Sequence, residues 1–455
     1  CCNNSSVTGT TVGTVSSVGN PTASTDSPFD DPAGFVFGEN EDQNVIKCGS
    51  YVGNGTDPGP EIYLGFEPSW LLMKRTDATN GGYLDNWVIF DAMRGIVSGG
   101  EDRWLNPNLN NAESANGQSI EVTPTGFKLR YTNYGNTNNA EYAYLAIRRR
   151  DGYVGKPPSL GTGVFAMDTG NSSSTQSFTS GFPVDFALVK LTSSSGTFDA
   201  TGRLIQGKYL TTNTNNSEGT WADYKFDQQD GFGTDSGFLS STQSWMWKRH
   251  AGFDVVCYPG QEFQGRQIPH SLNAVPEMIW VKNRTSVSEN WCVYHKGLNG
   301  GTNPEQYHLR LNTDVAELDN TFWDDTAPTS THFSVAFSAG QTNQDDKDYL
   351  AILFASTDVS VVGSYTGDGT SSNAISCGFQ PRFVFIKRAD STGDWKVWDS
   401  IRGTQFPFNN MLRLNTTNAQ VNDNLISFTS TGFSLISTDG TVNANSGSYI
   451  FYAHA

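Results

Sequence analysis

The sequence FQPRFVFIKR at residues 379–388 carries the pattern that decides the fold, and FEPSWLLMKR at residues 66–75 closely matches it. Residues 383–386 are apolar on both alternating faces, which is typical of a strand that is covered on both sides. A two-layer sandwich supplies such cover. The stretch therefore predicts an all-β fold built from sandwiches.

The same pattern recurs four times along the chain. In the first and last copies it is followed by WxxxDxxRG, at residues 87–95 and 395–403, and weaker copies begin at residues 184 and 275. The aligned lysines recur about every 105 residues, a period that suits a whole small domain better than a solenoid repeat. We expect tandem β-sandwich domains of a jelly-roll or lectin-like type, each with its own core. The four lysines are Lys74, Lys190, Lys282 and Lys387.

Domain boundaries follow from the repeats and from changes in composition. The N-terminal segment is rich in Ser, Thr, Gly and Asn and can bury little apolar surface, so it is interpreted as an extended arm or linker. The second repeat lacks the WxxxDxxRG motif and is divergent. The expected units are an arm at 1–44, repeat 1 at 45–153, repeat 2 at 154–251, repeat 3 at 252–357 and repeat 4 at 358–455.

Composition excludes several classes of function. The net charge of −17 and a pI near 4.7 argue against nucleic-acid binding, and the cluster Arg148-Arg149-Arg150 is expected to be a solvated strand end. No stretch approaches the roughly 20 apolar residues of a membrane span. The 6 cysteines are too few for a disulfide scaffold, and Cys48, Cys257 and Cys377 lie in apolar runs where buried thiols are expected.

No catalytic motif emerges, and we expect neither an enzyme nor a cofactor. The recurring pairs Asp91 with Arg94 and Asp399 with Arg402 precede a glycine turn, where a carboxylate is expected to accept backbone N–H groups or to pair with the recurring lysine. Acidic loops such as residues 345–348 and 324–325 could supply oxygens to calcium, but a solvated loop is the favoured interpretation. No catalytic or metal-binding residue is assigned.

Three tryptophans are candidates for ligand binding. Trp104 aligns with Arg310 and Arg413 of the third and fourth copies, positions expected to face solvent, and Trp221 lies in a polar loop without a clear counterpart. Exposed aromatic rings beside Asn, Asp and Glu suit sugars, because the ring covers the apolar face of a pyranose. Burial against a neighbouring domain or subunit is the alternative for both. Trp323 is a third candidate with an ambiguous alignment.

The line FxPxxVxIKR, WxxxDxxRG, LxxN, GF and YxxxA, taken from residues 379–453, resembles an uncharacterised repeat family of virion structural and tail-fibre proteins of tailed bacteriophages, notably cyanophages. The resemblance covers nearly everything after about residue 30 and is weakest in repeat 2. It implies a non-enzymatic virion protein of the tail fibre or capsid surface, made in the host cytoplasm. Its implied partners are other virion proteins, a host-surface glycan or receptor, and further copies of itself, possibly in a trimer.

Two other functions remain open from the sequence. A secreted or cell-surface lectin-like adhesin would have the same composition, and a signal peptide or lipobox upstream of Cys1 would favour it. A polysaccharide depolymerase would require two carboxylates brought close together by the fold.

Overall fold

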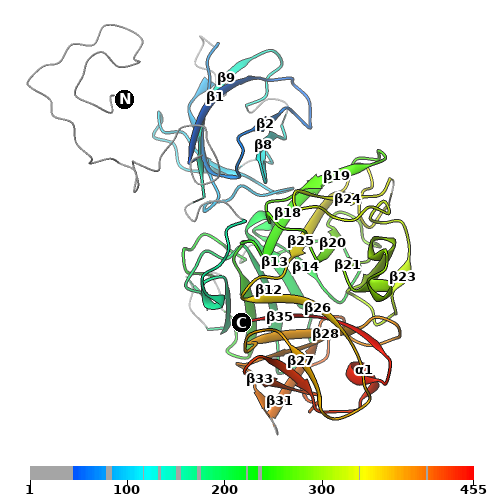
Figure 1. The fold of residues 1–455 in the computed structure, drawn as a ribbon. Helices are drawn as coiled ribbons and strands as arrows, with labels where there is room; N and C mark the ends of the chain where they lie inside the picture. Colours follow the sequence, from blue (N-terminus) through cyan, green and yellow to red (C-terminus); the bar gives the residue numbers. More distant parts are fainter. Residues whose placement is uncertain are drawn as a thin grey trace, which may run out of the picture. The chain divides into compact units, whose positions relative to one another are not determined.

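The recurring apolar strand is the third strand of each repeat, and each copy lies inside its own antiparallel sheet (Figure 1). The four copies are Pro68–Arg75 (β3), Phe186–Leu191 (β12), Met278–Asn283 (β20) and Phe383–Arg388 (β28). The computed structural model describes residues 45–77, 85–115, 117–131, 135–149, 155–171, 176–221, 224–233, 238–337, 339–405 and 408–455. The expected arm at 1–44 lies outside these residues.

Repeats 1 and 2 share one strand order. The large sheet of repeat 1 runs β1-β9-β3-β4-β5-β6 beside a small sheet β2-β8-β7, and repeat 2 has β10-β17-β12-β13-β14-β15 beside β11-β16. The other strands of repeat 1 are β1 (Ile46–Val52), β2 (Glu61–Tyr63), β4 (Val88–Asp91), β5 (Arg103–Leu105), β6 (Ser114–Ala115), β7 (Ile120–Thr123), β8 (Gly126–Leu129) and β9 (Glu141–Arg148). Those of repeat 2 are β10 (Phe165–Thr169), β11 (Phe178–Thr179), β13 (Phe198–Gly202), β14 (Lys208–Thr211), β15 (Gly219–Thr220), β16 (Gly231–Phe232) and β17 (Thr242–Trp247).

Repeats 3 and 4 repeat the plan. Their large sheets run β18-β25-β20-β21-β22-β23 and β26-β35-β28-β29-β31-β30, with β32 paired to β31, and their small sheets are β19-β24 and β27-β34-β33. The other strands of repeat 3 are β18 (Phe253–Pro259), β19 (Arg266–Pro269), β21 (Cys292–His295), β22 (Tyr307–Arg310), β23 (Leu318–Asp319), β24 (His332–Val335) and β25 (Asp348–Phe354). Those of repeat 4 are β26 (Ser360–Thr366), β27 (Asn373–Ser376), β29 (Lys396–Asp399), β30 (Thr404–Gln405), β31 (Phe408–Arg413), β32 (Val421–Asn422), β33 (Ile426–Thr429), β34 (Gly432–Leu435) and β35 (Ser448–His454).

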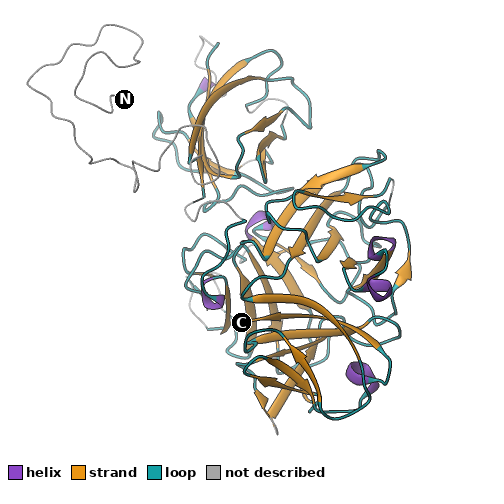
Figure 2. Cartoon of the chain, viewed as in Figure 1, coloured by secondary structure: helices purple, strands orange, loops and turns teal. Residues whose placement is uncertain are grey.

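Strands dominate the described chain, and the helices are short (Figure 2). They are α1 (Gly440–Asn443) and the 3-10 turns η2 (Gly161–Gly163), η3 (Arg203–Ile205), η4 (Leu298–Gly301) and η5 (Pro304–Gln306). Across the described ranges, no helix has the length and apolar character needed to cross a membrane. The expectation of an all-β fold made of repeated sandwich-like units is confirmed.

The inner face of each large sheet packs against the small sheet of the same repeat. In repeat 3, Ile279 and Val281 join Phe333 and Val335 of β24 in one apolar cluster. Repeats 2 and 4 have equivalent clusters built around Phe232 and Phe433. Alternation along the strand sends the neighbouring side chains to the outer face.

The outer faces of repeats 2, 3 and 4 are buried against one another. Aromatic rings link every pair of these repeats: Trp247 lies 5.7 Å from Phe253 and 5.6 Å from Phe383, and Trp280 lies 5.6 Å from Phe385, between ring centroids. The apolar strands are therefore covered on both sides, as the sequence indicates. The sandwich supplies only one of these covers, however, and the neighbouring repeats supply the other.

Three equivalent backbone hydrogen bonds close repeats 2 to 4 into a cycle, which we call the ring. Each runs from the amide just before β15, β23 or β32 of one repeat to the carbonyl two positions after the recurring lysine of the next. The pairs are Glu218 N to Arg284 O at 2.8 Å, Glu317 N to Ala389 O at 2.8 Å, and Gln420 N to Thr192 O at 2.9 Å. Every described strand pairing stays inside one repeat, so the repeats meet through side chains and turns.

Repeat 1 attaches to the ring through loops and ion pairs. The amide of Ser98 donates to Leu204 O, and Arg284 Nη2 donates to Ser98 O at 2.6 Å. Arg149 makes a two-pronged pair with Asp185, with both N–O distances at 2.9 Å. The expectation of a solvated arginine cluster is therefore wrong for Arg148 and Arg149, because Arg148 is buried and Arg149 neutralises a buried carboxylate of repeat 2.

The cysteines follow the expectation in two of three cases. Cys257 and Cys377 are buried, as is Cys292. Cys48 is exposed, contrary to the expectation, because it lies on the outer face of β1 and that face of repeat 1 is not covered by the ring.

Candidate functional site

Trp104 is buried at 2 % exposure, so the expectation that it faces solvent is wrong. Its strand partner Phe90 lies on the inner face of the sheet, and the two rings are 6.2 Å apart. The alignment of Trp104 with Arg310 and Arg413 is wrong by two residues. The amide of Trp87 donates to Asn108 Oδ1, just as those of Trp291 and Trp395 donate to Asn312 and Asn415, so the counterpart of Asn415 is Asn108 and not Asn106.

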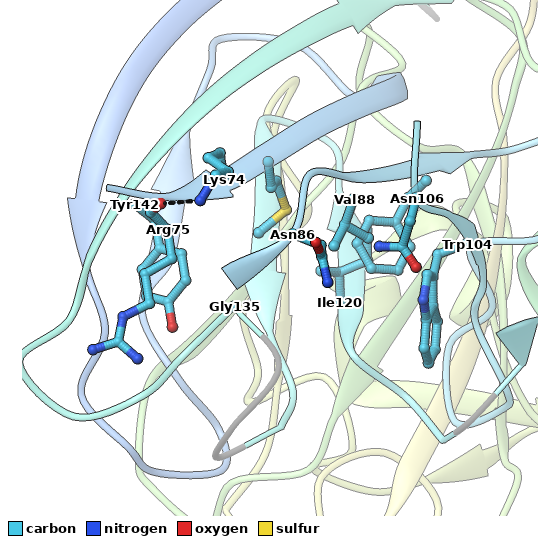
Figure 3. Close-up of a pocket in the computed structure, with 11 residues that line it drawn as sticks. Lys74, Arg75, Asn86, Val88, Trp104, Asn106, Ile120, Gly135 and Tyr142 are labelled. Carbon is cyan, nitrogen blue, oxygen red and sulfur yellow. Dashed lines mark hydrogen bonds between the residues drawn. The ribbon is translucent and has the colours of Figure 1, made fainter. Parts of the chain in front are cut away.

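Trp104 lines a pocket at the open end of the repeat 1 sandwich (Figure 3). Trp104 lies at one end of the pocket, Arg75 and Tyr142 lie at the other, and Lys74 Nζ donates to Arg75 O at 2.8 Å. The free volume is about 30 Å³, room for about one or two water molecules. Ligand pockets usually measure hundreds of cubic ångströms. In this conformation the pocket is a packing defect with too little space for a sugar.

Trp323 is also buried, at 2 % exposure, and its ring meets Tyr294 edge-on at 5.9 Å. It fills the inner core of repeat 3. The three candidate tryptophans lie in three different repeats, so the structure does not bring them together into one site.

Trp221 is the exposed member of the three, at 39 % exposure. It follows β15 and lies against the rings of Tyr224 at 5.2 Å, Phe238 at 5.8 Å and Tyr209 at 6.5 Å. Tyr224 Oη donates to Asp199 Oδ2 at 2.8 Å, which fixes the ring beneath Trp221. Burial raises the pKa of this carboxyl above its usual value. These rings form an aromatic shelf on repeat 2 with one accessible indole.

A groove of about 780 Å³ lies where repeats 1 and 2 meet. Charges of both signs line it, and Arg103 pairs with Glu113 at 2.8 Å. Thr220 belongs to the lining, whereas Trp221 and the rings that it contacts do not. The groove has the size of a ligand site, but the aromatic shelf does not open into it.

The two Asp-Arg turns are structural, as expected, although the cationic partner differs. Asp91 accepts the amides of Met93 and Arg94, and its second oxygen pairs with Arg94 Nε at 2.5 Å. Asp399 accepts Arg402 N and Nε in the same way. Neither aspartate pairs with the recurring lysine among the contacts of the described residues.

Lysines of the ring donate to backbone carbonyls, often of the neighbouring repeat. Lys190 Nζ donates to Thr417 O at 3.1 Å, and Lys387 Nζ to Asp314 O at 3.4 Å. Burial lowers the pKa of Lys190, Lys282 and Lys387 to about 8. These contacts join the lysines to the backbone of their own or a neighbouring repeat. Within the described ranges, no three His, Cys, Asp or Glu side chains converge as a metal site would need.

Residues 2–150 and 165–455 match a family model described as "Domain of unknown function (DUF7483)". The chain belongs to this family. The DUF7483 match spans all four repeats, so the ring and repeat 1 both lie inside the family's sequence. No curated protein matches the chain.

The sequence interpretation missed the exposure of Trp87. Trp87 occupies the same place as Trp291 and Trp395, and all three tryptophans stand at a recurring apolar position of the sequence. Trp291 and Trp395 are 0 % exposed, whereas Trp87 is 40 % exposed. The two buried indoles donate to carbonyls of the preceding repeat, Thr211 O at 2.9 Å and Arg310 O at 3.0 Å. No sequence signal separates the three, because the difference lies in what packs on them.

Proposed function

We propose that this DUF7483 protein is a non-enzymatic structural component of a bacteriophage virion, in a tail fibre or capsid appendage, and that it takes part in recognising host-surface glycans. The repeated line quoted above supports the virion assignment by resemblance. A ring with a shared aromatic core supports a structural role, because packed strands hold the surface loops in place. Its other partners would be neighbouring virion proteins.

The observation that carries glycan recognition is the accessible indole of Trp221 on the aromatic shelf. A ring held by packing loses little freedom when a sugar stacks on it. The glycan would have an exposed apolar pyranose face, and the single weak contact would be strengthened by multiple copies on a particle.

A glycan array compares the wild-type chain with Trp221→Ala. We expect binding to fall at least tenfold, because the stacking surface is lost. Leu239→Ala is the matched control, since Leu239 is an apolar residue of the same repeat with 67 % exposure. Equal loss in both variants, or no binding by the wild type, would contradict glycan recognition.

Location is tested separately by electron cryomicroscopy of native particles with antibody labelling of this chain. Labelling on a virion is the expected result. Labelling of the cell envelope would favour the adhesin, and release of reducing ends from a host polysaccharide would favour the depolymerase.

A further inference from the structure

Repeat 1 carries the same interface elements as the ring repeats, but on an open face. In each large sheet, the first five strands in the sheet order each contribute one residue to a row that crosses the outer face. Neighbouring residues of this row are strand partners, and we call the five residues the outer row. The outer rows of the ring repeats are at most 2 % exposed, apart from Met167 at 7 %. The outer row of repeat 2 is Met167, Trp245, Leu188, Ala200 and Leu210. That of repeat 3 is Val255, Ile352, Trp280, Val293 and Leu309. That of repeat 4 is Val362, Tyr452, Phe385, Val397 and Leu412.

In repeat 1 the outer row is apolar but uncovered. Cys48 is exposed, and Leu145, Leu72, Ile89 and Leu105 are only half-buried. The same face also exposes Ile46 at 44 %, Val52 at 55 % and Trp87 at 40 %. The end of the face at Trp70 borders a groove shared with repeat 2. The uncovered part of the outer face of repeat 1 therefore consists of the outer row and the end of the sheet that carries Lys74.

The polar groups that close the ring also have counterparts in repeat 1. By strand register, Glu113 corresponds to Glu218 and Glu317, and Thr76 corresponds to Arg284 and Ala389. Both Glu113 and Thr76 are exposed. Among the described residues, neither the Glu113 amide nor the Thr76 carbonyl has a hydrogen-bonding partner.

Repeat 1 thus carries the groups of both sides of a ring interface on one surface: the Trp87 indole and the Thr76 carbonyl belong to one side, and the Asn106 carbonyl and the Glu113 amide belong to the other. In the ring, each repeat donates an amide to a carbonyl of the next repeat, and three such steps close the cycle. At two of these contacts an indole donates in the opposite direction, from repeat 3 to repeat 2 and from repeat 4 to repeat 3. A surface that carries both sides is complementary to a copy of itself in a head-to-tail arrangement, and a rotation that closes after three steps gives a trimer.

We propose that three copies of this chain associate through repeat 1 and pack their outer rows as repeats 2, 3 and 4 do within one chain. The Trp87 indole of one copy would donate to the Asn106 carbonyl of a neighbouring copy, as Trp291 does to Thr211 O. In the opposite direction, the neighbour's Glu113 amide would donate to the Thr76 carbonyl of the first copy, as Glu218 does to Arg284 O. The inference stands on the ring geometry and holds for a virion protein or an adhesin alike.

Disulfide trapping tests the arrangement in the full chain. Thr76 follows β3 and Glu113 precedes β6, so three strand spacings, roughly 14 Å, separate them within one sheet. A disulfide needs Cα atoms within about 7 Å, so the two positions can be bridged only between copies. We expect Thr76→Cys with Glu113→Cys to give a covalent trimer on non-reducing gels, whereas each single variant gives none. Monomer from the double variant at micromolar concentration would overturn the proposal.

A second measurement places the interface without a new cysteine. Light scattering of the wild type should give three times the chain mass of 49.6 kDa, and Leu145→Arg should give one chain mass with unchanged circular dichroism. Val287→Arg is the control, because Val287 is 68 % exposed in repeat 3. A trimer that survives Leu145→Arg would assign association to another face. If the wild type is a monomer and alkylation of Cys48 becomes fast only after removal of residues 1–44, the N-terminal arm covers this face. Either result would contradict the proposal.

Discussion

Asp399 and Asp91 occupy equivalent turns, and their surroundings show how one residue type acquires two environments. Asp399 is fully buried and also accepts the Trp245 indole at 3.0 Å, whereas the side chain of Asp91 is 20 % exposed. Arg402 lies over the ring of Trp245 at 5.4 Å. The turn is set locally by the Asp-Arg sequence, and its burial is set by the repeat that packs over it.

The buried histidines predict a loss of stability in acid. Burial lowers the pKa of His250 and His295 to about 3, and that of His308 and His454 to about 4. Because the unfolded pKa is about 6.5, the unfolded chain binds these protons first as the pH falls. The free energy of unfolding should therefore decrease below about pH 6.5.

Urea unfolding between pH 7 and pH 4 checks this prediction. His454 alone should contribute a loss on the order of 3 kcal/mol at pH 4. The variant His454→Gln should show a shallower decrease over the same range, whatever its stability at pH 7. Identical slopes for the variant and the wild type would show that His454 does not contribute.

At the scale of the strand, β5 of repeat 1 and β22 of repeat 3 offer a matched comparison. Leu309 of β22 and Leu105 of β5 occupy the same place in the outer row, but Leu309 is 0 % exposed and Leu105 is half-buried. The two strands occupy the same position in the order of their large sheets. What differs is the neighbouring repeat that covers β22.

Leu309→Ala should lower the free energy of unfolding by about 2–5 kcal/mol, because it leaves a cavity in the ring core. Leu105→Ala should cost less than about 1.5 kcal/mol in the monomer, since water already reaches this side chain. Urea titrations at protein concentrations low enough to keep the chain monomeric make the comparison. Equal costs would mean that repeat 1's outer face is covered within one chain.

At the scale of the molecule, the ring makes three repeats one packing unit. Each ring repeat has an inner core of its own, yet its outer row is buried only when the other two are present. That each repeat can fold alone stays a prediction. The shared core indicates that an isolated ring repeat would expose a large apolar face to water.

A fragment of residues 154–455 should be a soluble monomer that unfolds in one transition, because it keeps the whole ring and lacks repeat 1. A fragment of residues 154–357 should aggregate, since removal of repeat 4 uncovers two outer rows. Light scattering and urea unfolding make both measurements. A stable, monomeric two-repeat fragment would show that the ring is not a cooperative unit.

The strands, the turns and the all-β class could be predicted from the sequence, because alternation, β-branched and aromatic residues and glycine turns act within a few residues. The sequence also predicted the repeat and the structural role of the Asp-Arg turns. It could not separate Trp87 from Trp395, or Trp104 from an exposed ring, since equivalent residues in similar strands differ only in what covers them. That three outer faces close on one another while the fourth remains open could not be predicted, because packing between segments a hundred residues apart leaves no local pattern in the sequence.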